Sequence, residues 1–168
     1  MDKDLRQKLT KCFELEDKLT TLYFKYSDIY HEDLSFWQML GEEENKHAAI
    51  FNSLINGLVD IKQYPSELLE VDKSELDEVN SKIDLLLNNL KTSTIPKEKA
   101  YEFALIIEHK SVELIFQKVG VNKLDDKAHR LFRNMVKEEK DHIIKMKEYF
   151  ARYEFQFTVN HRSKIPDI

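Results

Sequence analysis

The sequence contains two Glu-x-x-His motifs, Glu44 with His47 and Glu139 with His142. Residues three apart on a helix lie on the same face, so each motif directs a carboxylate and an imidazole into one space. Carboxylate oxygens and imidazole nitrogens are ligands that iron and manganese accept. In a chain rich in Glu a single motif carries little weight, but the second copy predicts a metal site.

Two further glutamates complete the pattern, one before each motif. Glu16 precedes Glu44 by 28 residues and Glu108 precedes Glu139 by 31, which suggests one helical hairpin used twice. A Glu from each of two helices and a Glu-x-x-His from each of the other two form the ligand set of di-iron and di-manganese bundles. We therefore predict that two metal ions are bound by Glu16, Glu44, His47, Glu108, Glu139 and His142.

Each of these residues takes a core position in an otherwise apolar helical seam. An ionised carboxylate in a bundle interior is costly unless it is paired or bound to metal, and two cations would supply one common counter-charge. Taken singly, Glu16 and Glu108 could each form a partly buried salt bridge to a lysine instead. The carboxylate-rich donor set favours iron, with manganese as the alternative, although zinc can substitute in crystals.

Other residues near the motifs have simpler interpretations. Tyr23 lies two helical turns after Glu16 on the same face, and is either a redox-active or hydrogen-bonding neighbour of the metals or a plain core tyrosine. Cys12 is expected to be a small buried side chain, and His109 to face away from the site. Solvated surface positions are expected for Glu42, Glu43, Glu138, His31, His129 and His161.

Helices are the elements that must position these ligands. The chain has only three glycines and three prolines, which favours long helices over a turn-rich β architecture. Apolar residues spaced three and four apart define their extent. Four bundle helices are predicted, at about 3–30, 35–56, 96–119 and 124–153.

A long connection, residues 57–95, joins the second and third of these helices. Gly57 is expected to end the second helix in a left-handed conformation, and a short helix from Ser74 to Leu90 is expected to open with a Ser-x-x-Asp cap. Such a connection can carry the chain from one end of a bundle to the other. The prediction is a single all-α domain over 1–168, a ferritin-like antiparallel four-helix bundle with a long crossover connection and a non-helical tail over 154–168.

Composition and charge exclude several function classes. A net charge of -5 with both signs interspersed argues against a nucleic-acid partner. No apolar run approaches the roughly 18 residues that a membrane span needs. One cysteine and an N-terminus without a signal-peptide core favour a reducing, cytoplasmic compartment. Helical bundles often pair through exposed aromatic faces, which leaves a homodimer open.

The chain resembles the rubrerythrin branch of the ferritin-like superfamily over about residues 5–153. The likeness rests on Glu16 followed by Tyr23, Glu-Glu-Glu-Asn-Lys-His-Ala from Glu42 to Ala48, Glu108, and Glu-Glu-Lys-Asp-His from Glu138 to His142. The resemblance implies that Glu44 and Glu139 bridge two iron ions. It implies that the remaining ligands are Glu16 and His47 on one ion, and Glu108 and His142 on the other.

The same resemblance implies an oxidoreductase whose reduced di-iron site reacts with hydrogen peroxide or dioxygen. Rubrerythrins commonly carry a rubredoxin domain with paired Cys-x-x-Cys motifs, which this chain lacks, so an external donor such as a separate rubredoxin-type protein is expected. Ser111 stands where rubrerythrins have an extra glutamate, which makes the ligand set closer to a symmetric bacterioferritin-like site. Two alternatives stay open: a ferroxidase that handles iron, and a non-catalytic metal-binding protein.

Overall fold

The computed structural model describes residues 1–58, 72–116, 127–155 and 164–165 of the chain. This part of the chain contains five α-helices, short 3-10 and π-helical segments, and no strand. The all-α prediction is therefore confirmed.

The chain divides into two compact units. The described residues of the first unit are 1–58 and 72–95, and those of the second unit are 96–116, 127–155 and 164–165. The predicted connection therefore contributes its described helix to the first unit. A single domain over the whole chain stays a prediction.

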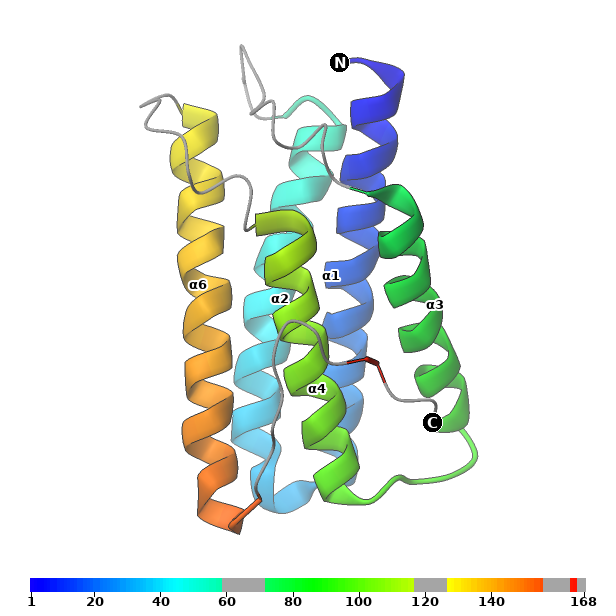
Figure 1. Ribbon diagram of the computed structural model, residues 1–168, viewed down its shortest axis with the longest axis vertical. Helices are drawn as coiled ribbons and strands as arrows, with labels where there is room; N and C mark the ends of the chain where they lie inside the picture. Colours follow the sequence, from blue (N-terminus) through cyan, green and yellow to red (C-terminus); the bar gives the residue numbers. More distant parts are fainter. Residues whose placement is uncertain (59–71, 117–126, 156–163, 166–168) are drawn as a thin grey trace. The chain divides into compact units, whose positions relative to one another are not determined.

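Three helices form the first unit. α1 spans Lys3–Ile29, α2 spans Leu34–Ile55 and α3 spans Lys73–Asn89. α1 and α2 lie side by side and run in opposite directions, and α3 packs along another side of α1 (Figure 1). Each end of these helices agrees within one residue with the ends predicted from the apolar spacing.

Two helix ends were predicted from local sequence signals, one correctly and one wrongly. Gly57 follows α2 with a φ of 68°, the left-handed conformation predicted for it, which glycine adopts without steric cost. The predicted cap of α3 at Ser74 is wrong, because Asp72 is the N-cap residue. Its carboxylate Oδ1 accepts a hydrogen bond of 2.8 Å from the backbone N–H of Ser74.

Apolar side chains at helical spacing form the core of the first unit. Leucines follow one face of α1, and aromatic and aliphatic residues of α2 and α3 pack with them. The fully buried members of this core include Leu9, Leu15, Leu19, Leu22, Trp37, Leu40, Phe51, Leu54, Leu76 and Ile83. Burial of side chains of this size contributes about 1.5–3 kcal/mol each.

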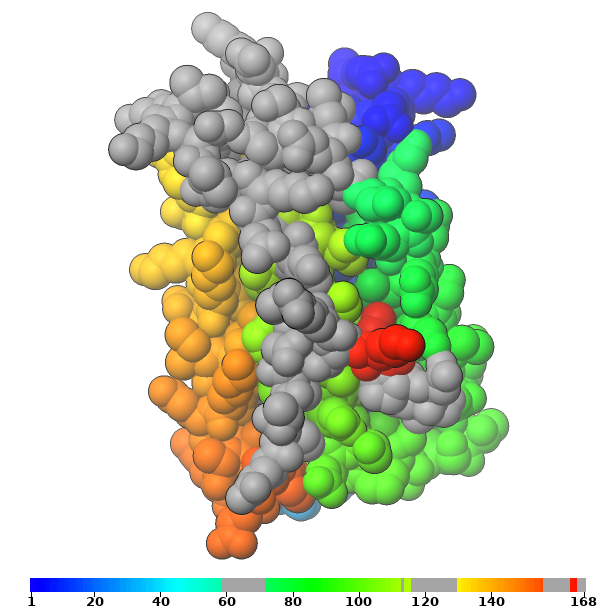
Figure 2. All heavy atoms as spheres, viewed as in Figure 1, coloured from blue at the N-terminus to red at the C-terminus, as the bar shows by residue number. Residues whose placement is uncertain are grey.

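Polar contacts fix α3 against α1. The buried Asn80 donates through Nδ2 to the backbone carbonyl of Lys11 at 3.3 Å and to that of Leu76 at 2.9 Å. Lys18 Nζ lies 2.7 Å from Asp84 Oδ2. The outward side of α3, green in Figure 2, carries solvent-exposed side chains, so this helix has one packed face and one solvated face.

Replacing Asn80 with alanine is expected to lower the free energy of unfolding by about 1–3 kcal/mol, because the Lys11 carbonyl loses its donor and a small void opens. Denaturant unfolding measures this change. Asn88→Ala, at an exposed position on the same helix, is the control and should change stability by less than about 0.5 kcal/mol. Equal losses of unfolding free energy in the two variants would show that the buried Asn80 contact does not stabilise the fold.

The described residues of the second unit form two α-helices, a π-helical segment and a short 3-10 turn. α4 spans Lys97–Ser111 and continues into a π-helical turn over Val112–Phe116, and α6 spans Lys127–Phe150. α4 and α6 pack against each other. The predicted helix at 96–119 is thus α-helical only as far as Ser111, and residues 117–119 and 124–126 lie outside the described part.

Aromatic residues close one end of the second unit. Tyr101 stacks on Phe150 with ring centroids 4.2 Å apart, and Lys97 Nζ lies 3.8 Å above the ring of Tyr153. Tyr153 belongs to a 3-10 turn, Ala151–Tyr153, that follows α6. Most of the tail predicted at 154–168 lies outside the described residues. No helix in the described part is both long and apolar enough to cross a membrane.

Candidate metal centre

Three predicted ligands meet in the core of the first unit: Glu16 of α1 with Glu44 and His47 of α2. All three side chains are buried, and each offers one ligand atom within 4.8 Å of those of the other two. His47 Nδ1 lies 3.2 Å from Glu44 Oε2. We call this group the first triad.

The helical repeat explains why these side chains meet. Glu16 lies between Cys12 and Leu19, one turn away on either side along the buried face of α1. On α2, Leu40 and Phe51 flank the Glu-x-x-His pair in the same way. The two antiparallel helices therefore share an apolar seam that is interrupted by ionisable groups at one level.

The donor geometry of the first triad suits a metal ion. Two donor atoms about 2.1 Å from one ion, at a right angle, are about 3 Å apart, close to the observed separation of the His47 and Glu44 atoms. Glu16 brings a second carboxylate to the same place. Two carboxylates this close repel each other in a buried site unless a proton or a cation is shared between them.

The second unit holds the other three predicted ligands, which we call the second triad: Glu108 of α4 with Glu139 and His142 of α6. All three side chains are 0% exposed. Glu108 Oε2 lies 3.7 Å from His142 Nδ1, and Glu139 lies one helical turn before His142 on the same helix. Each triad therefore consists of two buried carboxylates and one buried imidazole.

Ser111 ends α4 directly before the π-helical turn. Its side chain is fully buried, and its hydroxyl has no hydrogen-bond partner among the described residues. A buried hydroxyl one turn after Glu108 adds a small polar group and no charge to this part of the second unit. Single π turns inside helices often occur at functional sites.

Tyr23 is part of an aromatic cluster in the first unit. Its ring stacks on that of Trp37 with centroids 5.7 Å apart, and Trp37 also contacts Tyr26 at 4.9 Å. Tyr26 contacts Tyr30 at 5.7 Å. Sequence reasoning placed Tyr23 and Tyr30 in the seam of the first helix and Trp37 in that of the second, and it missed Tyr26, which contacts both Tyr30 and Trp37. The three- and four-residue spacing of the tyrosines was the available signal.

The residues assigned to the surface are found largely where expected. Glu42, Glu138 and His31 are exposed, and Glu43 and His109 are partly exposed. The side chains of His129 and His161 lie outside the described residues. Within the described part, the acidic residues next to the two motifs are therefore at least partly exposed to solvent, whereas the residues of the triads are buried.

Cys12 is buried beside the first triad, as predicted. Burial raises the pKa of its thiol above the ordinary value of 9.0, and the Glu16 carboxylate adds to the shift. In the metal-free protein the thiol therefore stays protonated at neutral pH, which argues against a thiolate nucleophile.

This shift predicts how stability depends on alkaline pH. Above about pH 9 the unfolded chain loses a proton that the folded protein retains, so Cys12 reduces the free energy of unfolding by up to about 1.4 kcal/mol per pH unit. Urea unfolding at about pH 8 and about pH 10 should show a smaller loss in Cys12→Ala than in the wild type. Parallel losses in both proteins would contradict this assignment.

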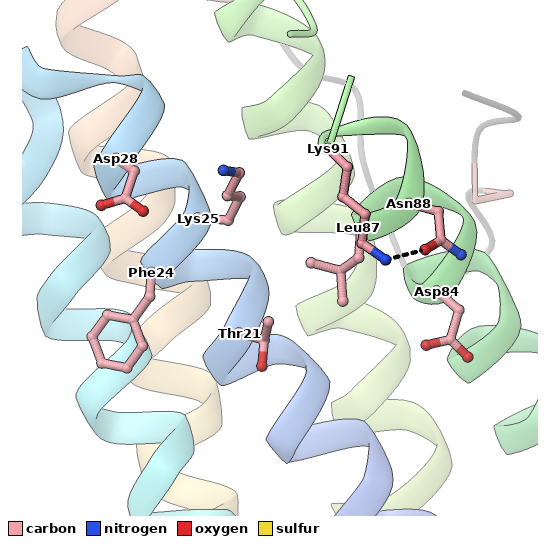
Figure 3. A pocket seen from close by; sticks show the side chains of 8 residues that line it. All are labelled: Thr21, Phe24, Lys25, Asp28, Asp84, Leu87, Asn88 and Lys91. Atoms are coloured by element: carbon pink, nitrogen blue, oxygen red, sulfur yellow. Dashed lines mark hydrogen bonds between the residues drawn. The ribbon is translucent and has the colours of Figure 1, made fainter. Parts of the chain in front are cut away.

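A pocket of about 790 Å³ lies between α1 and α3 (Figure 3). Lys91 Nζ donates to Asn88 Oδ1 at 2.8 Å on its rim. Both charge signs are present among its lining residues, Thr21, Phe24, Lys25, Asp28, Asp84, Leu87, Asn88 and Lys91. None of these is a predicted ligand, so the pocket has no part in metal binding.

Comparison of the chain with protein-family models, curated proteins and solved structures gave no match. We therefore infer the function from the chemistry of the two triads.

Proposed function

We propose that the two triads together bind one carboxylate-bridged pair of metal ions, most simply iron, in a ferritin-like four-helix bundle similar to that of rubrerythrin. The observation that carries this proposal is the equal composition of the triads. Each triad consists of two buried carboxylates and one buried imidazole, at the positions that the repeated helical hairpin assigns to them. Four carboxylates would balance the charge of two divalent cations.

The donor set favours iron and leaves manganese as the alternative metal. Oxygen donors from four carboxylates and two neutral imidazoles suit both metals, whereas zinc sites use fewer ligands and often thiolates. None of the six predicted ligands is a cysteine.

We infer that the protein is an oxidoreductase that acts on hydrogen peroxide or dioxygen. A pair of ferrous ions would supply two electrons to such an oxidant. The chain would hold the ions through the six ligands, keep water out with the leucine and aromatic side chains beside them, and supply no strong acid of its own. Because residue 111 is a serine, the six ligands would have no further ionisable side chain beside them at this position. An external one-electron donor, such as a rubredoxin-type protein, would restore the reduced state.

Stopped-flow oxidation of the anaerobically iron-loaded protein tests this function. Stoichiometric hydrogen peroxide should oxidise two ferrous ions per chain much faster than air-saturated buffer does. Glu44→Gln should abolish the fast phase, and Glu42→Gln, at an exposed neighbouring position, should retain it.

Other outcomes would assign the site differently. Turnover of many ferrous ions per chain with a mineral product would favour iron handling. Tight binding of two metals with no reaction toward either oxidant would leave a non-catalytic metal-binding protein.

A further inference from the structure

Four aromatic residues form a continuous cluster in the first unit, and the proposed ligand chemistry does not use them. The centroid distances are 5.7 Å for Tyr23–Trp37, 4.9 Å for Tyr26–Trp37 and 5.7 Å for Tyr26–Tyr30. Tyr23, Tyr26 and Trp37 are fully buried, and Tyr30 is 8% exposed. The cluster therefore leads from the core toward the turn between α1 and α2.

The inner end of the cluster lies near the first triad. Tyr23 follows Glu16 by seven residues on α1, and Trp37 precedes Glu44 by seven on α2. Two helical turns correspond to about 10 Å along each helix. Side chains on a helix point toward its N-terminus, so Tyr23 extends back toward Glu16. The outer end, Tyr30, is followed by the exposed His31.

We propose that Trp37 is a redox-active residue that carries single electrons between the α1–α2 turn and the first triad, with Tyr23 on its inner side and Tyr26 and Tyr30 on its outer side. This proposal rests on the proposed oxidoreductase function, because it needs a redox centre at the triad. It adds an entry route for the electrons that an external donor delivers.

The electrons balance in two one-electron steps. Trp37 would give one electron through Tyr23 to the centre that the peroxide or dioxygen substrate has oxidised, which would leave the indole as a radical cation. One electron from an external one-electron reductant then refills Trp37 across Tyr30 and Tyr26. No bond forms or breaks, and one electron enters the chain for each one that leaves it.

Trp37 is better suited than Tyr26 to be the side chain that is oxidised to a radical. A tyrosine radical is neutral, so the phenol must give up its proton when it is oxidised. Burial raises the pKa of Tyr26 well above its ordinary value, and its hydroxyl has no hydrogen-bond acceptor among the described residues. An indole can lose an electron and keep its N–H. Tyr26 therefore acts as a bridge, and phenylalanine could replace it.

Flash photolysis of the metal-free protein tests the route without any metal chemistry. A thiol-reactive ruthenium polypyridyl complex is attached to His31→Cys, an exposed position beside Tyr30, and the buried Cys12 stays unlabelled. After oxidative quenching, a transient tryptophan radical is expected. The chain has one tryptophan, so the signal can come only from Trp37.

Three labelled variants separate redox function from packing. Trp37→Phe should lower the total radical yield by about an order of magnitude. Tyr26→Phe should leave the tryptophan radical yield unchanged, as should Phe36→Leu, which alters the packing beside Trp37. Absence of a tryptophan radical in the labelled His31→Cys protein, or an undiminished radical yield when Trp37→Phe is added to it, would overturn the proposal.

The outcome is independent of the proposed metal centre. Failure of the flash experiment with normal iron oxidation would remove the relay and leave the oxidoreductase proposal in place. A tryptophan radical in a protein that binds no metal would support electron movement through the cluster while the proposed function fails.

Discussion

Replacing Glu16 with leucine is expected to make the metal-free protein more stable, by about 1–4 kcal/mol in the free energy of unfolding. Glu16 is 0% exposed, and one of its carboxylate oxygens lies within 4.8 Å of a Glu44 carboxylate oxygen. Leucine has a similar volume, removes the buried charge and extends the apolar face between Cys12 and Leu19. Denaturant unfolding of protein treated with a chelator measures the change.

The same substitution should reverse the order of stability when metal is present. The wild type should gain about 4 kcal/mol at a free metal concentration about 1,000 times the dissociation constant, because metal binds only the folded state. Glu16→Leu should lose most of this gain. Such a reversal is typical of a functional site, where groups that bind a ligand cost stability in its absence.

Glu42→Leu is the matched control, since Glu42 is exposed on α2 and adjacent to the same motif region. It should change the stability of the metal-free protein by less than about 0.5 kcal/mol and keep the metal-dependent gain. If Glu16→Leu instead destabilised the metal-free protein and retained the gain, Glu16 would be a structural residue paired within the core.

Helix positions were predictable from the sequence because the apolar residues that recur at helical spacing are the ones that are buried. The buried residues of α1 follow the three- and four-residue spacing from Leu5 to Tyr26, so the apolar pattern alone located the helix within one residue. The candidate ligands are recognisable in the sequence for the opposite reason. Glu44 and His47 interrupt such a pattern, and ionisable residues in a core seam require an explanation beyond packing.

Three features of the fold were not predictable from the sequence: the N-cap of α3, the π-helical turn after α4 and the packing contact of α3 with α1. Asp72 and Ser74 are both good cap residues, and only the fold shows that Asp72 accepts the hydrogen bond. The change from α- to π-helical hydrogen bonding after Ser111 has no clear signal in the preceding residues. The contact of Asn80 with the Lys11 carbonyl depends on how α3 packs on α1.

The aromatic cluster is an intermediate case. The spacing of Tyr23, Tyr26 and Tyr30 puts them on one side of α1, which the sequence reveals. Their connection through Trp37 of α2 requires the antiparallel register of the two helices. The equal seven-residue distances from Tyr23 to Glu16 and from Trp37 to Glu44 become informative only when that register is known.

Replacing Glu139 with glutamine should abolish the binding of both metal ions, although the first triad is left intact. In the proposed centre Glu139 would hold both ions, so loss of its charge would weaken the binding of each. Loss of a supporting residue around a metal ligand commonly costs 10- to 100-fold in affinity, and loss of a bridging ligand should cost at least about 100-fold. Anaerobic titration with ferrous iron, followed by metal analysis after gel filtration, measures the stoichiometry.

Glu138→Gln is the matched control, because Glu138 is the exposed neighbour of Glu139 on α6. It should bind two ions per chain, as the wild type should. A double-mutant cycle of Glu44→Gln with Glu139→Gln then tests whether the triads act as one centre. In a single centre, either substitution alone removes both ions and the second adds little, so the effects are far from additive. If Glu139→Gln retained one tightly bound ion and Glu44→Gln removed it, the triads would be independent sites and the proposal of a shared dimetal centre would be wrong.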